Sequence, residues 1–562
     1  MSSAVSSPGA ARPRAKLTLA SIAVAFAAAD TYVVVLALPD LMSGVGLSAD
    51  QLQRAAPIIS GFLLGYIAVL PLIGRIADVA GRTPVLVGAL MLFAVGSLIT
   101  AAAYDLPLVV TGRFLQGVGG GGLVPATLAL VADLWPAERR GLPLGVVGAV
   151  QELGSVLGPL LGAAVLAVAD WRYIFWLNLV VAVVLAVLLR GARRPPWSAA
   201  VGLLAAVALG LTLLAPQRLA SDVTLGLPFV PFAGTSRLAT PIGVATLVLG
   251  LVWAGLVLWR SRSHLTGLLA QIDLIGALLL ALALAGVVLA FATADPEREL
   301  MSPAGPWLLV GAAVFGVAFW VWQRRAPHAI VPAGLLATRP AWGSLVVSFL
   351  VGCALIAALV DVPVFARTTQ GGGQLAAALV LLRFLIALPV GAVVGGWLTR
   401  RYGLGLITGA GLALAGAMFV VMAFWSRNAL DHFAATVVLL LCGFGFGLAL
   451  SPVNTAILGA TPRANHGLVS ALVVVARMVG MLVGVSALTA IGLRRYFAIV
   501  DDVPSPNELC PATPASCRPF VDALRDAAIS QTHAIFAGAA VCAFLAAILA
   551  VALLGRRGVV HT

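Results

Sequence analysis

Long runs of apolar residues, separated by short polar or charged connections, recur along almost the whole chain. A helix needs ~20 apolar residues to cross the hydrocarbon of a bilayer, and sixteen runs have about that length. They are residues 17–38, 55–74, 84–103, 107–131, 141–168, 172–190, 197–214, 242–259, 273–293, 306–323, 341–360, 375–398, 404–424, 434–457, 467–492 and 533–554. The pattern predicts an all-α polytopic membrane protein. Because the number of spans is even, both termini lie on one side.

Five ionisable side chains interrupt these apolar runs: Asp30, Arg113, Glu152, Arg383 and Arg477. An ionised group inside a span costs ~3 kcal/mol or more unless it is paired, solvated or neutralised by a proton. Burial favours the neutral form of a carboxyl group, and a nearby arginine favours its charged form. We therefore expect Asp30 and Glu152 to bind and release protons, with the arginines as charge partners. The alternative for each is a structural ion pair.

Glycines line one face of the fifth run, which reads GAVQELGSVLGPLLGA from Gly148 to Ala163. Such a stripe lets a neighbouring helix backbone approach closely, and the proline within it is expected to bend the helix. A second version follows some 326 residues later, where Gly467, Arg477, Gly480 and Gly484 repeat the positions of Gly141, Gln151, Gly154 and Gly158. Internal repeats of this kind build transporters whose site lies between two moving halves.

Composition and charge agree with a membrane protein and exclude other classes. The chain is 61% hydrophobic and 10% charged, with a mean hydropathy of +1.08, far outside the range of soluble domains. The net charge of +13 does not indicate nucleic acid, since about 20 of the 34 Lys and Arg residues lie in connections on the side of the termini. That bias predicts cytoplasmic termini. The sequence contains no metal-binding His pair, phosphate-binding loop or serine nucleophile motif, so we expect no enzyme activity, cofactor or metal.

The ends of the chain and one long connection are polar. Residues 1–16 and 558–562 are expected to be cytoplasmic tails, the first of them disordered. The connection 493–532 is expected on the outer side, where Cys510 and Cys517 are candidates for a disulfide; the alternative is two free thiols. Within it, the segment PFVDALRDAAIS has helical spacing and is expected either to lie on the membrane surface or to cap the bundle.

Four segments, taken in order, resemble motifs of the major facilitator superfamily. They are ADTYVVVLALP at 29–39, GRIADVAGRTP at 74–84, RFLQGVGGGG at 113–122 and ELGSVLGPLLG at 152–162. The first and the last are similar to motifs of its fourteen-span drug:proton antiporter branch. Parts of both halves look especially like the mycobacterial triacylglyceride exporters, which work alongside a periplasmic lipoprotein.

The resemblance implies roles for particular residues. The cytoplasmic gating motif would be Gly74, Asp78, Gly81 and Arg82. The antiporter motif would be Gly154, Gly158, Pro159 and Gly162. It also implies that the fifth helix of the first half faces the second helix of the second half, which would set Glu152 against Arg383.

The resemblance further implies two six-helix bundles, residues 17–194 and 336–557, that face one another in the cytoplasmic membrane of a bacterium. Between them, residues 195–335 contain four apolar segments where the family has a linker pair, so 197–259 is an addition. We expect this extra pair to span the membrane; the alternative is a re-entrant hairpin.

The expected function is proton-coupled export of lipids such as triacylglycerides, or of other hydrophobic compounds. One proton entering releases ~2.3 kcal/mol per 100 mV and ~1.4 kcal/mol per pH unit, whereas exposing each buried lipid CH₂ costs ~0.8 kcal/mol. A lipid cargo must therefore keep its tails in apolar surroundings and enter sideways between helices. Two alternatives stay open: a multidrug efflux antiporter, and a receptor or scaffold that transports nothing.

Overall fold

The computed structural model describes residues 11–47, 52–136, 139–191, 198–214, 227–232, 240–260, 273–292, 302–327, 329–370, 374–510 and 517–555. Within these ranges the regular structure is helical, and twelve helices are long and apolar enough to cross a membrane. Helices α1 and α5 coincide with two further predicted runs, and α7 and α9 are apolar but shorter. The predicted all-α polytopic fold is confirmed.

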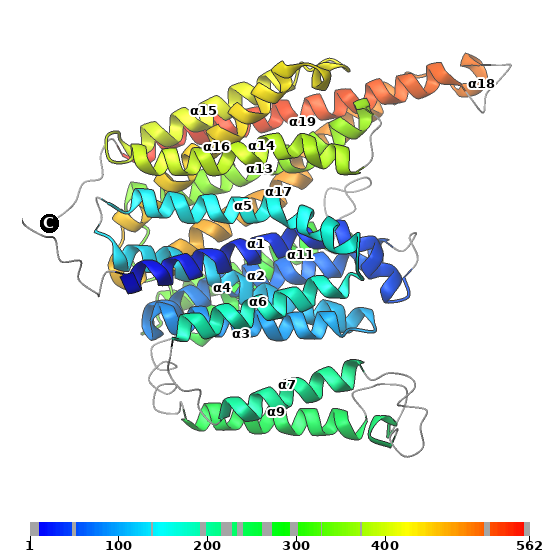
Figure 1. Ribbon diagram of the computed structural model, residues 1–562. Helices are drawn as coiled ribbons and strands as arrows, with labels where there is room; N and C mark the ends of the chain where they lie inside the picture. Colours follow the sequence, from blue (N-terminus) through cyan, green and yellow to red (C-terminus); the bar gives the residue numbers. More distant parts are fainter. Residues whose placement is uncertain are drawn as a thin grey trace, which may run out of the picture.

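Six helices form the first bundle, and six others form the second (Figure 1). The first bundle consists of α1 (Ala11–Gly44), α2 (Leu52–Ala80), α3 (Arg82–Ala101), α4 (Leu106–Leu134), α5 (Gly141–Leu166) and α6 (Arg172–Arg190). The second consists of α13 (Arg339–Gln370), α14 (Gln374–Leu398), α15 (Leu404–Met422), α16 (Phe433–Gly459), α17 (His466–Val500) and α19 (Arg518–Leu553). α1 packs on α5 and α2 on α4, just as α13 packs on α17 and α14 on α16.

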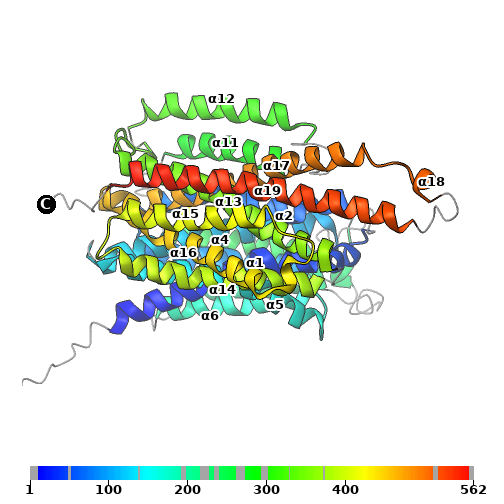
Figure 2. The same ribbon diagram turned by 90° about the horizontal axis from the view of Figure 1, so that it is seen from above.

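Both described ends of the chain lie at the same end of the molecule, on the left of Figures 1 and 2. We call this the terminal end. α1 begins at Ala11, so residues 11–16, expected in a disordered tail, form its first turns instead. The remainder of that tail and residues 558–562 lie outside the described residues.

Four helices join the two bundles: α7 (Ser198–Leu214), α9 (Pro241–Arg260), α11 (Leu274–Ala292) and α12 (Gly305–Gln323). α11 packs against α2 and α17, and so covers the seam between the halves on that face, with α12 outside it (Figure 2). The α7–α9 pair lies apart and touches α3 (Figure 1). Asp273 fixes the end of α11, because its carboxylate accepts hydrogen bonds from the Gly276 N–H and from the side chains of Trp322 and Gln323 on α12.

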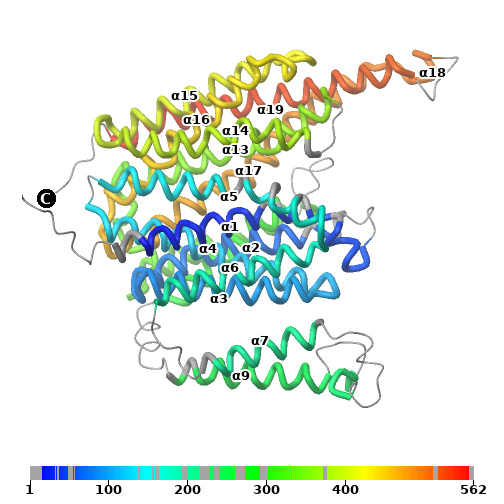
Figure 3. The backbone as a smooth tube through the Cα atoms, viewed as in Figure 1, coloured from blue at the N-terminus to red at the C-terminus, as the bar shows by residue number. Residues whose placement is uncertain are grey.

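The connection expected at residues 493–532 is mostly helical. α17 continues to Val500, α18 (Pro506–Leu509) follows, and α19 begins at Arg518. The segment PFVDALRDAAIS therefore forms the first turns of α19, neither a surface helix nor a separate cap, and these turns project beyond the bundle (Figure 3). A disulfide joins Cys510 to Cys517 at the tip of this projection.

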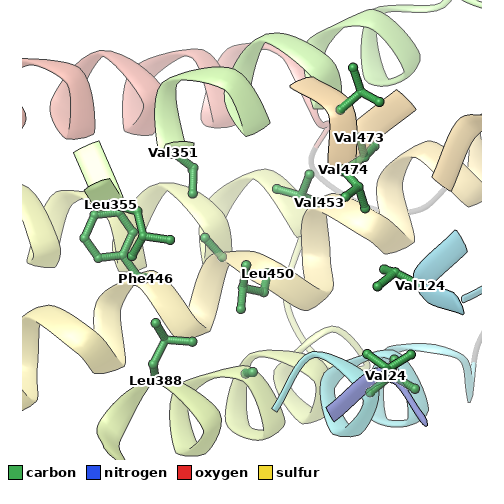
Figure 4. Packing of buried hydrophobic residues seen from close by; sticks show 14 of the residues in the cluster. Val24, Val124, Val351, Leu355, Leu388, Phe446, Leu450, Val453, Val473 and Val474 are labelled. Carbon is green, nitrogen blue, oxygen red and sulfur yellow. The ribbon is translucent and has the colours of Figure 1, made fainter. Parts of the chain in front are cut away.

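The two bundles share a continuous apolar core. Val24 and Val124 of the first half and Leu388, Leu450 and Val473 of the second belong to one cluster of buried residues (Figure 4). The polar groups described below are therefore set in surroundings with little water, where electrostatic interactions are strong.

Glycines bring the helices of each bundle into backbone contact at equivalent places. A Cβ atom added to Gly117 of α4 would collide with the carbonyl oxygen of Phe62 on α2. One added to Gly443 of α16 would collide with the carbonyl oxygen of Phe384 on α14. Both contacts lie where the repeats match, so close packing of the second and fourth helices is a property of each half.

Gly117→Val and Gly443→Val are expected to destabilise the protein by ~1–3 kcal/mol or more, because the obstructing atoms belong to backbone that cannot rotate away. Thermal midpoints in detergent, read by size-exclusion after heating, should fall for both variants. Gly88→Val on α3 is the matched control, since its Cβ would meet open space. A midpoint unchanged from wild type in the first two variants would contradict the proposed packing role.

Candidate functional site

Asp30 lies inside the first bundle, where three helices meet. One carboxyl oxygen pairs with Nη1 of Arg113 on α4 at 2.5 Å, and the other accepts a hydrogen bond from the side-chain amide of Asn178 on α6. Both charged side chains are almost completely buried. The Arg113 guanidinium also lies 4.4 Å from the centre of the Phe62 ring, a distance suited to a cation–π contact. The charge of Asp30 is therefore fully compensated in this conformation.

Arg113 is held by a second set of polar residues. It donates to Gln116 Oε1 at 3.0 Å, and Gln116 in turn donates to Ser97 Oγ on α3 at 2.8 Å. Thr100 lies 3.4 Å from the same amide oxygen. This network ties α3 to the Asp30 site and keeps Arg113 in place whether or not Asp30 carries a charge.

Glu152 and Arg477 form an ion pair between the two halves. Glu152 Oε1 on α5 lies 3.8 Å from Arg477 Nη1 on α17, and both side chains are largely buried. Arg477 lines a hollow of the second bundle. Apart from Arg477, Ser348 and Asn454, the lining of this hollow is apolar. A movement that separates the halves must break this pair, whereas the Asp30 network lies within one half.

The expected pairing of Glu152 with Arg383 is wrong. α5 does pack against α14, which carries Arg383, but Arg383 Nη1 donates to Thr436 Oγ1 on α16 at 2.9 Å. The helix arrangement that the resemblance implied is therefore present, and the arginine facing Glu152 comes from α17 instead. Among the residues that the structure describes, Arg383 is in no ion pair.

Residues of the predicted gating motif join the halves at the terminal end. Asp78 at the end of α2 accepts hydrogen bonds from the backbone N–H groups of Gly467 (2.8 Å) and Leu468 (2.9 Å) at the start of α17. Gly74 lies against the backbone of Gly467, so that the helices touch directly. A carboxylate suits a helix N-terminus because unpaired N–H groups and the helix dipole favour negative charge there.

Arg82 completes this clamp. Its guanidinium pairs with Asp78 at 2.6 Å and with Asp133 at 3.3 Å. Gly81 adopts φ of +91° immediately before α3, a conformation that a glycine takes at low cost. In the predicted gating motif, the two glycines therefore permit the geometry and Asp78 and Arg82 supply the charges.

A second contact closes the terminal end on the other face. Gly141 at the start of α5 lies against Gly396 of α14, and Ser451 Oγ donates to the Gly141 carbonyl at 2.7 Å. Together with the Asp78 clamp, this contact holds the two halves in a conformation that is shut at the terminal end.

The antiporter-motif glycines lie within the first bundle. Gly154 and Gly158 pack against the backbone of Ala25 and Ala29 on α1, so they bring α5 close to the helix that carries Asp30. Gly162 lines a hollow beside Asp30. Pro159 belongs to α5, but its side chain is outside the described part of the structure, so the predicted bend stays a prediction.

Sequence reasoning did not assign three polar residues to the site: Gln116, Asn178 and Ser451. Each interrupts an apolar run, and a search for uncharged polar residues in those runs would have found them. Asp361 on α13 is buried and forms no ion pair within the described part of the chain. The described residues contain no group of three or more metal-ligating side chains.

Comparison with known proteins assigns these features to one family. The sequence profile of the Major Facilitator Superfamily matches residues 20–485. The triacylglyceride transporter of Mycolicibacterium smegmatis is 35% identical over 559 residues, which cover 96% of this chain and 87% of that protein. The triacylglyceride transporter of Mycolicibacterium hassiacum is 37% identical over 491 residues, 85% of this chain and 79% of that protein.

Solved structures show the same fold at low sequence identity. The human organic anion transporter MFSD10 (TETRAN) aligns over 97% of this chain and 100% of its own, with a TM-score of 0.56 and 15% identity. The proton:xylose symporter XylE aligns over 98% of this chain and 97% of its own, with a TM-score of 0.54 and 14% identity.

Proposed function

Because the chain belongs to the major facilitator superfamily and is similar to triacylglyceride transporters over most of its length, we propose that it exports triacylglycerides or related neutral lipids in exchange for protons. The Glu152–Arg477 pair carries this proposal, because it joins an acid of one half to a base of the other. When the halves separate, Glu152 loses the charge that stabilises its ionised form and gains affinity for a proton. Rocking of the halves and protonation are then linked.

The terminal end is proposed to face the cytoplasm of a bacterial cell, as the distribution of Lys and Arg favours. In that orientation the Asp78 clamp shuts the cytoplasmic end. Protons would reach Glu152 from the outer side when the halves separate there and the pair with Arg477 breaks, and re-formation of the pair would drive them off toward the inside once the clamp opens. Asp30 would hold the second proton site, with Arg113 and Asn178 competing with the proton for its carboxyl oxygens.

The proposed cargo enters from the bilayer. Since ~0.8 kcal/mol is needed for each lipid CH₂ exposed to water, a long acyl chain must stay in apolar contact throughout. α11 covers the seam between α2 and α17, whereas α5 and α14 meet on the opposite face without a linker helix against them in the described structure. The α5–α14 seam is therefore the proposed lateral entrance.

The projecting ends of α17 and α19 are proposed to contact a periplasmic lipoprotein that accepts the lipid. They extend past the bundle at the end opposite the termini, and the Cys510–Cys517 disulfide closes their tip. Retention of a candidate lipoprotein by the whole chain, and its loss when residues 501–517 are replaced by a short Gly-Ser linker, would test this contact.

The transport proposal is tested with purified protein in liposomes that contain a fluorescent triacylglyceride. An inward proton gradient is expected to accelerate release of the lipid to albumin outside the vesicles, and a protonophore should abolish the acceleration. Protein-free vesicles give the background. Release that ignores the gradient would contradict proton coupling, whereas gradient-driven movement of a cationic dye without movement of the lipid would favour the drug-exporter alternative.

A further inference from the structure

A hollow lies between α5 and α6, separate from the passage between the halves. Leu161, Gly162 and Val165 of α5 form one wall, and Ile174, Leu177 and Asn178 of α6 form the other. The floor is α1, which contributes Phe26, Ala29, Asp30 and Val33. The hollow is open on one side and has a cavity volume of about 20 Å³, and its lining is apolar except at Asp30 and Asn178.

This hollow opens toward the bilayer. Its rim residues Leu161 and Leu177 are 38% and 40% exposed, and on α5 the same exposed face continues through Leu157 and Leu153. Glu152 lies on the opposite side of α5, where it faces Arg477. α1 is visible between α5 and α6 from the outside of the bundle (Figure 1). Lipid, rather than the central passage, is therefore the neighbour of this opening.

The polar floor has unused hydrogen-bonding capacity. Both oxygens of Asp30 are occupied, one by Arg113 and the other by Asn178. Asn178 is only 4% exposed, and one N–H of its side-chain amide donates a hydrogen bond to Asp30. No other residue that the structure describes bonds its amide oxygen or its second N–H. A ligand that supplied a partner for these polar atoms would therefore bind favourably.

We propose that this hollow binds a neutral acylglycerol drawn from the bilayer. The hollow would take a hydroxyl group or an ester carbonyl, which Asn178 would bond, and the attached acyl chain would extend into the bilayer past Leu161 and Leu177. Asn178 lies six residues into α6, about 9 Å below the helix end at 1.5 Å per residue. A phosphate headgroup carries a charge that is costly to hold at that depth, whereas a glycerol ester carries none. The proposal deepens the lipid-export function and rests on it for its biological role.

Occupancy of the hollow would be coupled to Asp30. A lipid group that bonds the unused oxygen and N–H of Asn178 pulls the amide toward the hollow, and this weakens the Asn178–Asp30 hydrogen bond that stabilises the ionised carboxylate. Lipid binding then favours protonation of Asp30, and protonation favours lipid binding by the same factor. The site would thus link the presence of cargo in the membrane to proton uptake.

The test uses a triacylglyceride with a photoreactive diazirine on one acyl chain, the whole protein in liposomes, and no proton gradient. Labelled peptides are expected to include the α5 segment around Leu161 and the α6 segment around Leu177. Leu161→Trp and Leu177→Trp should lower this labelling about tenfold, the change that a loss of ~1.4 kcal/mol produces. The matched controls are Leu157→Trp and Val184→Trp, exposed positions on the same helices that do not line the hollow.

Labelling of these segments to the same extent in all four variants would overturn the proposal, and so would equal labelling by a photoreactive phosphatidylglycerol. A further variant, Asn178→Leu, removes the hydrogen bond while keeping the size of the side chain, and it should also reduce labelling. Because the readout needs no gradient, loss of transport with labelling intact would count against the export function alone.

Discussion

Asp30→Asn is expected to abolish gradient-driven lipid transport while leaving the protein folded. The side-chain amide of asparagine neither takes up nor releases a proton at physiological pH. A transport cycle that moves one proton at Asp30 therefore loses the free energy of the proton gradient. At 100 mV and one pH unit that drive is ~3.7 kcal/mol per proton, or two to three orders of magnitude in the accumulation ratio. Lipid release from gradient-loaded liposomes, compared with release after collapse of the gradient, measures the effect.

The same substitution leaves Arg113 buried without its anionic partner, which costs stability. Glu152→Gln is therefore the second variant, because its pair is longer, at 3.8 Å, and less enclosed. The matched control is Asp522→Asn, which removes an acid from a 3.0 Å pair with Arg427 outside the bundle. Full gradient dependence in both buried variants would refute the proposed coupling sites, and equal loss in the control would trace the effect to general charge loss.

The number, type and order of the helices could be predicted because each helix corresponds to one continuous apolar run in the sequence. A run of ~20 apolar residues has few alternatives in a bilayer, where every backbone polar group must bond within its own segment. The limits of the helices were less predictable. Both α17 and α19 extend into polar sequence beyond the apolar runs: α17 ends at Val500 and α19 begins at Arg518. The C-terminal part of α17 and the N-terminal part of α19 are helical because the two helices pack against each other.

The charged residues of the candidate site are visible in the sequence, because they interrupt apolar runs. The partner of each charge could not be predicted. Arg383 and Arg477 both lie on helices near α5, and only the rotation of each helix decides which of them reaches Glu152. Rotation follows from packing of small residues such as Gly480 against Phe349. A periodicity argument fixes a face to about a quarter turn, which is too coarse to choose between two arginines.

The clamp at the terminal end illustrates what the repeat adds. Asp78 bonds the first N–H groups of α17, which belongs to the other half. At the matching position of the second half stands Arg400, which has no carboxylate to offer a helix N-terminus. The second closing contact instead uses the Ser451 hydroxyl and the bare backbone of Gly141 and Gly396. The two faces therefore differ in strength, and only one of them depends on a charge.

Asp78→Ala is accordingly expected to open the terminal end. It removes two hydrogen bonds to a charged acceptor, worth ~1.5–3 kcal/mol each, and also the pair with Arg82. The population with separated ends should rise by about a hundredfold or more relative to wild type. Spin labels at Arg139→Cys and Arg400→Cys, exposed positions on either half, would report it as a longer distance, once Cys353, Cys442 and Cys542 are replaced by alanine.

Asp133→Ala provides the matched control, because Asp133 also pairs with Arg82, at 3.3 Å, but among the described residues it makes no hydrogen bond to the other half. Its removal takes one acid from the cluster and leaves the bridge from Asp78 to α17 intact. The distance distribution of this control should match that of wild type. If Asp78→Ala also matches wild type, the glycine contacts alone hold the end shut; if both variants open equally, the state of Arg82 controls the closure, and the bridge across the halves does not.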